Sequence, residues 1–142
     1  GDWTHQIYQE TFSRYIKVGS SHQTLAFRLS TGWVHGEARS SEQFWVGGSE
    51  TLRGYDYGEF VGHSKLVANA EYRFPIADQV QGVFFVDAGR AWKEDETMKL
   101  EDMQVGYGFG IRLNTPIGML RLDYGMSRDR HGQPYISIGQ TF

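Results

Sequence analysis

The segment 103–114, MQVGYGFGIRLN, limits the possible folds more than any other part of the sequence. Its side chains alternate between large apolar residues on one face and glycine or polar residues on the other, and a period of two indicates a β-strand. A soluble sheet would bury the apolar face and expose polar side chains rather than glycines. Because glycine usually marks the close approach of another backbone, we expect another segment to cover the face of Gly106, Gly108 and Gly110. The apolar face consists of Val105, Tyr107, Phe109, Ile111 and Leu113.

The same alternation recurs along most of the chain. It is clearest in 65–74, KLVANAEYRF, where the residues that share a face with Leu66 are all apolar and the opposite face carries Glu71. In 80–92, one of the two faces carries Asp87. An apolar face opposite a face with charges is typical of a sheet between two unlike media. Strands are therefore expected at 24–36, 65–74, 80–92, 103–114, 118–127 and 134–142, with a less regular strand at 3–18.

The lengths of the strands and loops favour a membrane-spanning sheet. The chain has no run of apolar residues long enough for a transmembrane helix. Its mean hydropathy of −0.49 still suits a membrane β-barrel, because only alternate residues of a barrel face lipid. Short turns alternate with long polar loops at 36–63, 93–102 and 127–134. We expect an all-β, antiparallel transmembrane β-barrel, or barrel fragment, of about seven or eight strands. A soluble antiparallel sandwich is the alternative.

The composition argues against several classes of function. A net charge of −3 lacks the basic face that nucleic-acid binding requires, and the absence of cysteine excludes disulfides and thiolate metal sites. The five histidines are scattered over ends and loops, and no Gly-x-Ser-x-Gly elbow or Ser-His-Asp set is recognisable. We therefore expect no catalytic residue, no metal, no cofactor and no nucleic-acid partner, so that the protein is not an enzyme. The start of the chain has no signal peptide, which suits a cytosolic protein or a mature or truncated piece of an exported one.

Five segments of the chain together resemble a known family. They are GGSETLRGY, EYRFP, FVDAGRAW, GYGFGIRLNTPIGMLRLDYG and the terminal ISIGQTF. In this order and at ordinary strand spacing, they resemble roughly the last half of the barrel of the BamA/TamA outer-membrane assembly superfamily. The alternation of side chains by itself indicates only an outer-membrane barrel.

The resemblance implies a position for the glycine-rich loop around 46–55. In such proteins this loop folds back into the barrel lumen, and its arginine meets carboxylates on the inner wall. Here Arg53 would meet Glu71 and Asp87, which alternation places on the polar faces, since a charge removed from water must be paired. The glycines of 103–114 would leave space for the loop backbone. The alternative is a solvated Arg53 at the loop tip. The loop motif consists of Gly47, Gly48, Arg53, Gly54 and Tyr55.

The resemblance also implies a function and partners. The family assists the folding and insertion of client outer-membrane proteins, and its last strand resembles a terminal signal that the assembly machinery recognises by strand addition. Here that signal would be Ile136, Ile138 and Phe142, all on the lipid-facing side. The expected partners are outer-membrane lipid, client proteins and the assembly machinery, in a bacterial-type outer membrane. A small structural barrel without insertase activity, or a two-partner secretion transporter, are the alternatives.

The chain departs from the family pattern in size. The family's barrel is larger and follows soluble POTRA domains, whereas we expect 1–142 to form a single barrel domain without a POTRA-like segment. Three explanations remain open: a truncated piece, a small stand-alone barrel, or two copies that pair through their open edges into a larger barrel. The last explanation would make the chain a homodimer.

Overall fold

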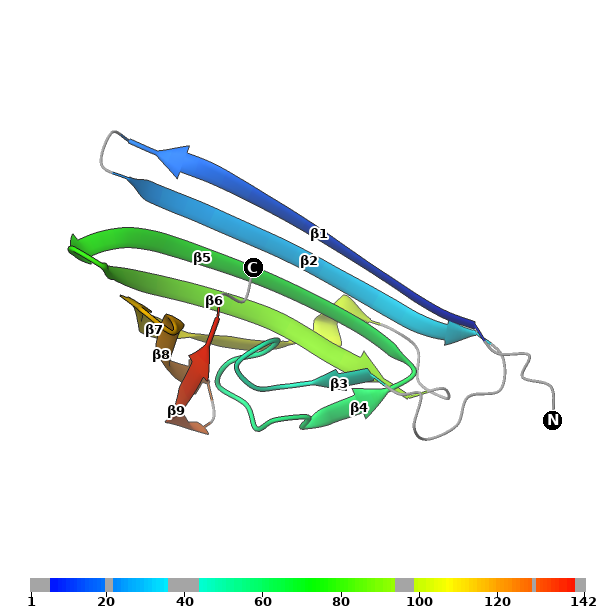
Figure 1. Cartoon of the computed structure of the whole chain (residues 1–142). Helices are drawn as coiled ribbons and strands as arrows, with labels where there is room; N and C mark the ends of the chain where they lie inside the picture. The colour runs from blue at the N-terminus through cyan, green and yellow to red at the C-terminus, as the bar shows by residue number, and fades with distance from the viewer. Residues whose placement is uncertain (1–5, 20–21, 36–43, 94–98, 129, 140–142) are drawn as a thin grey trace.

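The computed structural model describes residues 6–19, 22–35, 44–93, 99–128 and 130–139. Seven long strands form one antiparallel sheet in the order β1-β2-β5-β6-β7-β8-β9, and each strand pairs with its neighbours along the chain (Figure 1). The strands are β1 (Gln6–Val18), β2 (Gln23–His35), β5 (Ser64–Ala77), β6 (Val80–Trp92), β7 (Gln104–Thr115), β8 (Gly118–Ser127) and β9 (Arg130–Ile138). The hairpin β3 (Phe44–Val46) and β4 (Phe60–Gly62) lies within the connection from β2 to β5, and a short 3₁₀ turn, η2 (Leu100–Asp102), precedes β7.

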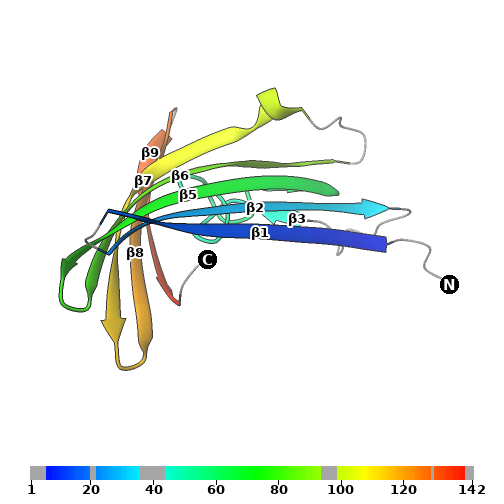
Figure 2. The same cartoon turned by 90° about the horizontal axis from the view of Figure 1, so that it is seen from above.

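The sheet is curved, and the connection that carries β3 and β4 lies on its concave side (Figures 1 and 2). Among the described residues, β1 pairs only with β2 and β9 only with β8, so the sheet does not close into a complete barrel. No helix in the described part of the chain is long and apolar enough to cross a membrane.

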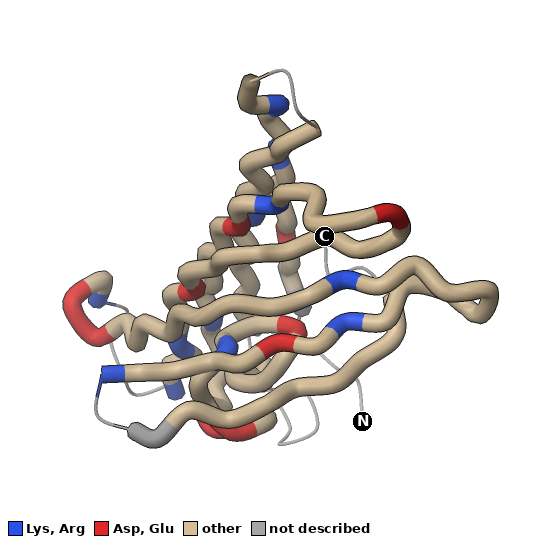
Figure 3. Tube along the Cα trace, turned by 90° about the vertical axis from the view of Figure 1, so that its left-hand side faces the viewer, with Lys and Arg blue, Asp and Glu red and all other residues tan. Residues whose placement is uncertain are grey.

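Burial in this sheet is the reverse of burial in a soluble sandwich. On β5 the buried residues are those of the polar face, including Asn69 and Glu71. On β7 the outward side chains are exposed; Phe109, for example, is 51% exposed. Charged residues of both signs lie along the strands as well as in the connections (Figure 3). The apolar outer face and polar inner face are those that the alternation predicts, and the soluble sandwich is wrong.

A small hydrophobic core lies on the concave side, between the loop and the wall. Its buried members are Val46, Leu52, Tyr55, Val67 and Ala91, with Phe60 packed against them. Three of the five come from the connection between β2 and β5, so this connection supplies most of what the concave face packs against. Burial of these side chains fixes the path of the loop across the wall.

The predicted boundaries differ from the structure mainly near the C-terminus. The segment 127–134 was expected to be a long loop, but β9 begins at Arg130 and pairs with Ser127, so most of the expected loop belongs to β9. Pro134, where the sequence predicts the last strand to begin, lies within β9 opposite Tyr124. Proline is tolerated there because an edge strand need not donate every backbone N–H to a neighbour. The described part of this strand ends at Ile138.

Candidate functional site

The loop between β3 and β4 lies close to the wall because three of its residues are glycines. Gly47, Gly48 and Gly54 have φ angles of 131°, 107° and 103°, which favour glycine. Gly48 and Leu52 exchange two backbone hydrogen bonds and close a tight turn. A Cβ atom on Gly54 would lie 2.6 Å from the carbonyl oxygen of Met126 on β8. The residue after Arg53 therefore has to be glycine for the loop to lie this close to the sheet.

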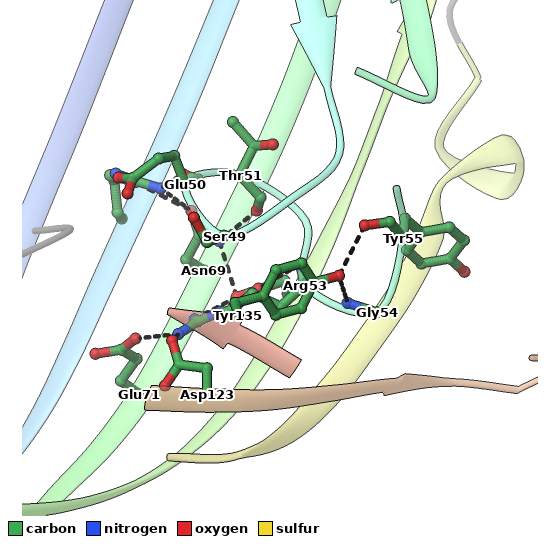
Figure 4. A network of polar contacts seen from close by, with 12 residues as sticks. Ser49, Glu50, Thr51, Arg53, Gly54, Tyr55, Asn69, Glu71, Asp123 and Tyr135 are labelled. Carbon is green, nitrogen blue, oxygen red and sulfur yellow. Dashed lines mark hydrogen bonds and ion pairs between the residues drawn. The ribbon is translucent and has the colours of Figure 1, made fainter. Parts of the chain in front are cut away.

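Arg53 lies in the centre of a buried polar network, and its side chain is 1% exposed (Figure 4). Its Nε and Nη2 donate to the two carboxylate oxygens of Asp87 at 2.7 and 2.8 Å, and its backbone N–H donates to Asp87 Oδ2 at 3.0 Å. Its Nη1 donates to Glu71 Oε2 at 2.6 Å and lies 3.5 Å from Asp123 Oδ2. The ring of Phe85 lies 3.7 Å from the guanidinium carbon. A planar guanidinium thus engages three carboxylates and an aromatic face together.

The structure brings together Arg53, Glu71 and Asp87 as the sequence and the resemblance imply, and Arg53 is not at a solvated tip. Burial on its own would lower the pKa of the Arg53 guanidinium. The hydrogen bond and charge of Asp87, with the charges of Glu71 and Asp123, raise this pKa above its ordinary value. The guanidinium therefore stays charged, and each carboxylate has a cationic partner.

A second set of arginines surrounds the same carboxylates. Arg112 on β7 contacts Asp123 at 2.5 Å and Glu71 at 3.4 Å. Arg121 contacts Asp123 at 3.2 Å, and Arg73 contacts Glu71 at 3.0 Å. Alternation places Asp123 and these three arginines on the polar faces of their strands, but the sequence does not predict their contacts. Their position on the strand faces opposite the apolar side chains was the one sequence feature that could have indicated them.

Two further contacts hold the turn of the loop against the wall. Arg121 Nη2 donates to the carbonyl oxygen of Ser49 at 3.1 Å, and Arg121 Nη1 contacts Glu50 Oε1 at 3.0 Å. Asn69 donates to the carbonyl oxygen of Thr51 and to Asp87 Oδ1, both at 2.8 Å. The loop is therefore bound through its backbone as well as through its arginine.

Tyr135 links the loop to the last strand (Figure 4). Its hydroxyl accepts a hydrogen bond from the Gly54 N–H at 2.8 Å and donates one to the Tyr55 carbonyl oxygen at 2.7 Å. The ring of Tyr57 packs edge-on against it, with centroids 5.9 Å apart. The sequence places Tyr135 on the inner face of its strand but gives no indication of this contact. β9 is thus coupled to the same loop as β5 and β6.

The three glycines of β7 make room for different groups. A Cβ atom on Gly106 would collide with the carbonyl oxygen of Arg53, so this glycine does accommodate the loop backbone. A Cβ atom on Gly108 would instead collide with the carbonyl oxygen of Tyr124 on β8 and lie 2.8 Å from the Phe85 ring, and one on Gly110 would collide with the Asp123 carboxylate. The expectation that all three face the loop backbone is therefore corrected for Gly108 and Gly110. Gly125 on β8, which was not singled out, would carry a Cβ only 2.5 Å from the Gly54 nitrogen.

Two of the three residues of the expected terminal signal lie on the outer face. Ile136 and Ile138 are 71% and 67% exposed on β9, while Phe142 lies outside the described residues. Within the described ranges, no group of three histidine or acidic side chains is arranged to hold a metal ion. The three clustered carboxylates are instead engaged by arginine.

A curved antiparallel sheet with an apolar outer face, and with a loop bound to its polar inner face, defines part of an outer-membrane β-barrel with an inward-folded loop. The model of the Omp85 superfamily domain matches residues 4–142, and the chain belongs to this superfamily. The resemblance to the BamA/TamA barrel is confirmed.

Three comparisons describe the relation to known proteins. The chain is 33% identical over 133 residues to "Outer envelope protein 80, chloroplastic" of Arabidopsis thaliana, covering 87% of this chain and 18% of that protein. It is 32% identical over 135 residues to "Outer envelope protein 39, chloroplastic" of the same plant, covering 89% of this chain and 37% of that protein. The crystal structure of BamA from Haemophilus ducreyi lacking POTRA domains 1–3 superposes with a TM-score of 0.78 and 18% identity, over 94% of this chain and 34% of that chain.

These comparisons fix the fold and the family. The chain spans 18% and 37% of the length of the two Arabidopsis relatives. Membership of the superfamily and the apolar outer wall assign the chain to an outer membrane. The names of the Arabidopsis proteins assign those two relatives to the chloroplast outer envelope.

Proposed function

We propose that this chain forms the C-terminal part of the barrel of an outer-membrane assembly protein, which assists the folding and insertion of client outer-membrane β-barrels. Residues 1–142 would form a single barrel domain, or the part of one that ends at the last strand. The activity needs no covalent chemistry, so the protein is not an enzyme. Superfamily membership and the BamA-like fold support this proposal.

The observation that carries the proposal is the linkage of the inward-folded loop to the strands near the C-terminal edge of the sheet. Arg53 engages β5, β6 and β8, and Tyr135 adds β9. This linkage gives β9 a fixed position although it pairs with only one described strand. An edge strand with unpaired backbone groups is a template for another strand. In the hydrocarbon layer unpaired groups are strongly unfavourable, so a client strand would be stabilised by pairing there.

The proposed partners follow from the same geometry. Lipid covers the outer wall, and client strands pair at the edge of β9. The assembly machinery recognises the terminal signal through the outward side chains of Ile136 and Ile138. The other edge, on β1, also needs a strand, which further strands of a longer chain or a second copy would supply. The membrane we propose is a bacterial-type outer membrane or the related outer envelope in which the chloroplast relatives are named.

The proposal is tested by reconstitution. The purified chain is folded into phospholipid vesicles, an unfolded client β-barrel protein is added, and insertion is scored by protease protection and by the gel shift of the folded client. Insertion should be faster than into empty vesicles and into vesicles that hold an unrelated closed barrel at the same density. Equal rates in the three samples would favour a structural barrel without insertase activity.

A further inference from the structure

The outer wall contains an apolar groove that the proposed function does not use. It lies across β1, β2, β5 and β6 and has a volume of about 460 Å³. Two cross-strand rows build it, one through Phe12, Leu29, Ala68 and Ala88 and the other through Arg14, Phe27, Ala70 and Val86. The alanines are too short to reach the level of the large side chains beside them, so the centre of the wall is hollow.

The groove continues towards the end of the sheet where β1 and β2 are joined. A second hollow of about 230 Å³ shares Ala70 and Val86 with the first and is bounded by Leu25, Tyr72 and Phe84. These last three residues form the next outward row of the sheet. Three rows, each two residues apart, give a continuous apolar surface about 13 Å long along the strands. Such a shape suits an extended hydrocarbon chain.

One cation lies at the rim of this groove. Arg14 is exposed on the outer face of β1 and has no hydrogen-bonding or ionic partner among the described residues. It lies four residues before Val18, where β1 ends, and this corresponds to roughly 10 Å of membrane depth in a tilted strand. An arginine side chain of this length directs its guanidinium towards the interface. A positive charge is thereby placed beside an acyl-chain groove, at the level of lipid phosphates.

We propose that the outer wall binds one anionic phospholipid, with an acyl chain in the alanine-floored groove and the phosphate paired with Arg14. The lining of the groove faces hydrocarbon, which favours an acyl chain, and the unpaired guanidinium favours an anionic headgroup. This site depends on the outer-membrane location of the chain and not on insertase activity.

Glu10 provides a matched control on the same face. It lies four residues from Arg14 on β1, opposite Thr31, and is not part of the groove. Removal of its charge changes the same strand and the same face without changing the proposed site. Val105 provides a control for size, since it is exposed on the outer face of β7.

The test measures lipid binding to the folded, delipidated chain by native mass spectrometry. Phosphatidylglycerol or phosphatidylcholine is titrated into the detergent-solubilised protein. The unmodified chain should retain one phosphatidylglycerol, and retain it about fivefold better than phosphatidylcholine, as one partly exposed ion pair provides. Arg14→Gln should remove this preference, and Ala70→Phe should remove the one-lipid species. Glu10→Gln and Val105→Phe should leave both unchanged.

Folding of every variant is checked by the gel shift of the unheated protein, and Ala68→Leu replaces Ala70→Phe if the latter does not fold. Equal retention of the two lipids by the unmodified chain would overturn the proposal, and so would a preference that survives Arg14→Gln. Retention of one phosphatidylglycerol by a variant with a filled groove would also overturn it.

Discussion

Replacement of Arg53 by alanine is the most direct test of the loop network. The substitution removes every side-chain contact that Arg53 makes with Asp87, Glu71 and Asp123. Asp87 is 0% and Glu71 2% exposed, so both carboxylates would remain buried with fewer partners. Removal of one partner from a buried ion pair destabilises a protein by about 3–5 kcal/mol. Part of this loss is relieved here because Arg112 and Arg73 still contact Glu71.

The assay is heat modification on semi-native gels, in which the folded sheet and the unfolded chain migrate differently. A loss of a few kcal/mol should lower the temperature of half-unfolding by on the order of 10 °C. Arg53→Lys should give an intermediate loss, because an ammonium group cannot form the bidentate contact with Asp87. Lys17→Ala, which removes an exposed cation near the end of β1, should leave the profile unchanged.

A double-mutant cycle separates the contact from other effects of the substitution. Asp87→Asn alone should also destabilise the protein, and the double variant should lose less than the sum of the two single losses. An Arg53→Ala profile that coincides with that of the unmodified protein would refute the reasoning, as would strictly additive losses in the cycle.

Three further predictions concern other parts of the sheet. Tyr135→Phe removes the hydroxyl that bonds the Gly54 N–H, and it should cost about 1–3 kcal/mol and speed proteolysis within the loop, measured by limited digestion; an unchanged digestion rate would contradict the linkage. Gly106→Ala places a methyl group against the Arg53 carbonyl oxygen and should lower the gel-shift melting temperature, and an unchanged temperature would show that the loop can move away. Phe109→Arg on the outer face should weaken insertion into vesicles by about 2–4 kcal/mol, measured as the folded fraction in a urea titration, whereas equal folded fractions would argue against a lipid-facing position.

The sequence was sufficient to predict the faces of the strands, because side-chain direction in a strand depends only on the period of two. Glu71 and Asp87 could therefore be placed on the inner wall without knowledge of the register. Their contact with Arg53 also required the resemblance to the family, since no local pattern shows that a loop returns to the wall.

The contacts of Asp123, Arg112 and Tyr135 could not be predicted in this way. They depend on the curvature of the sheet and on the path of the loop, which are set by long-range packing rather than by local periodicity. The turn before β9 was missed for a different reason. The polar sequence of 127–134 suggested a loop, but polar side chains do not interrupt a strand of a barrel wall.

The arginines on the concave side have a mechanical consequence for the wall. Arg112 contacts Glu71 on β5 and Asp123 on β8, two strands that are separated by β6 and β7. If the sheet flattened, these two carboxylates would move apart and Arg112 could reach only one of them. Because the Arg112 side chain has a fixed length, it limits how far β5 and β8 can move apart. The sheet therefore keeps its curvature although its strands do not close into a barrel.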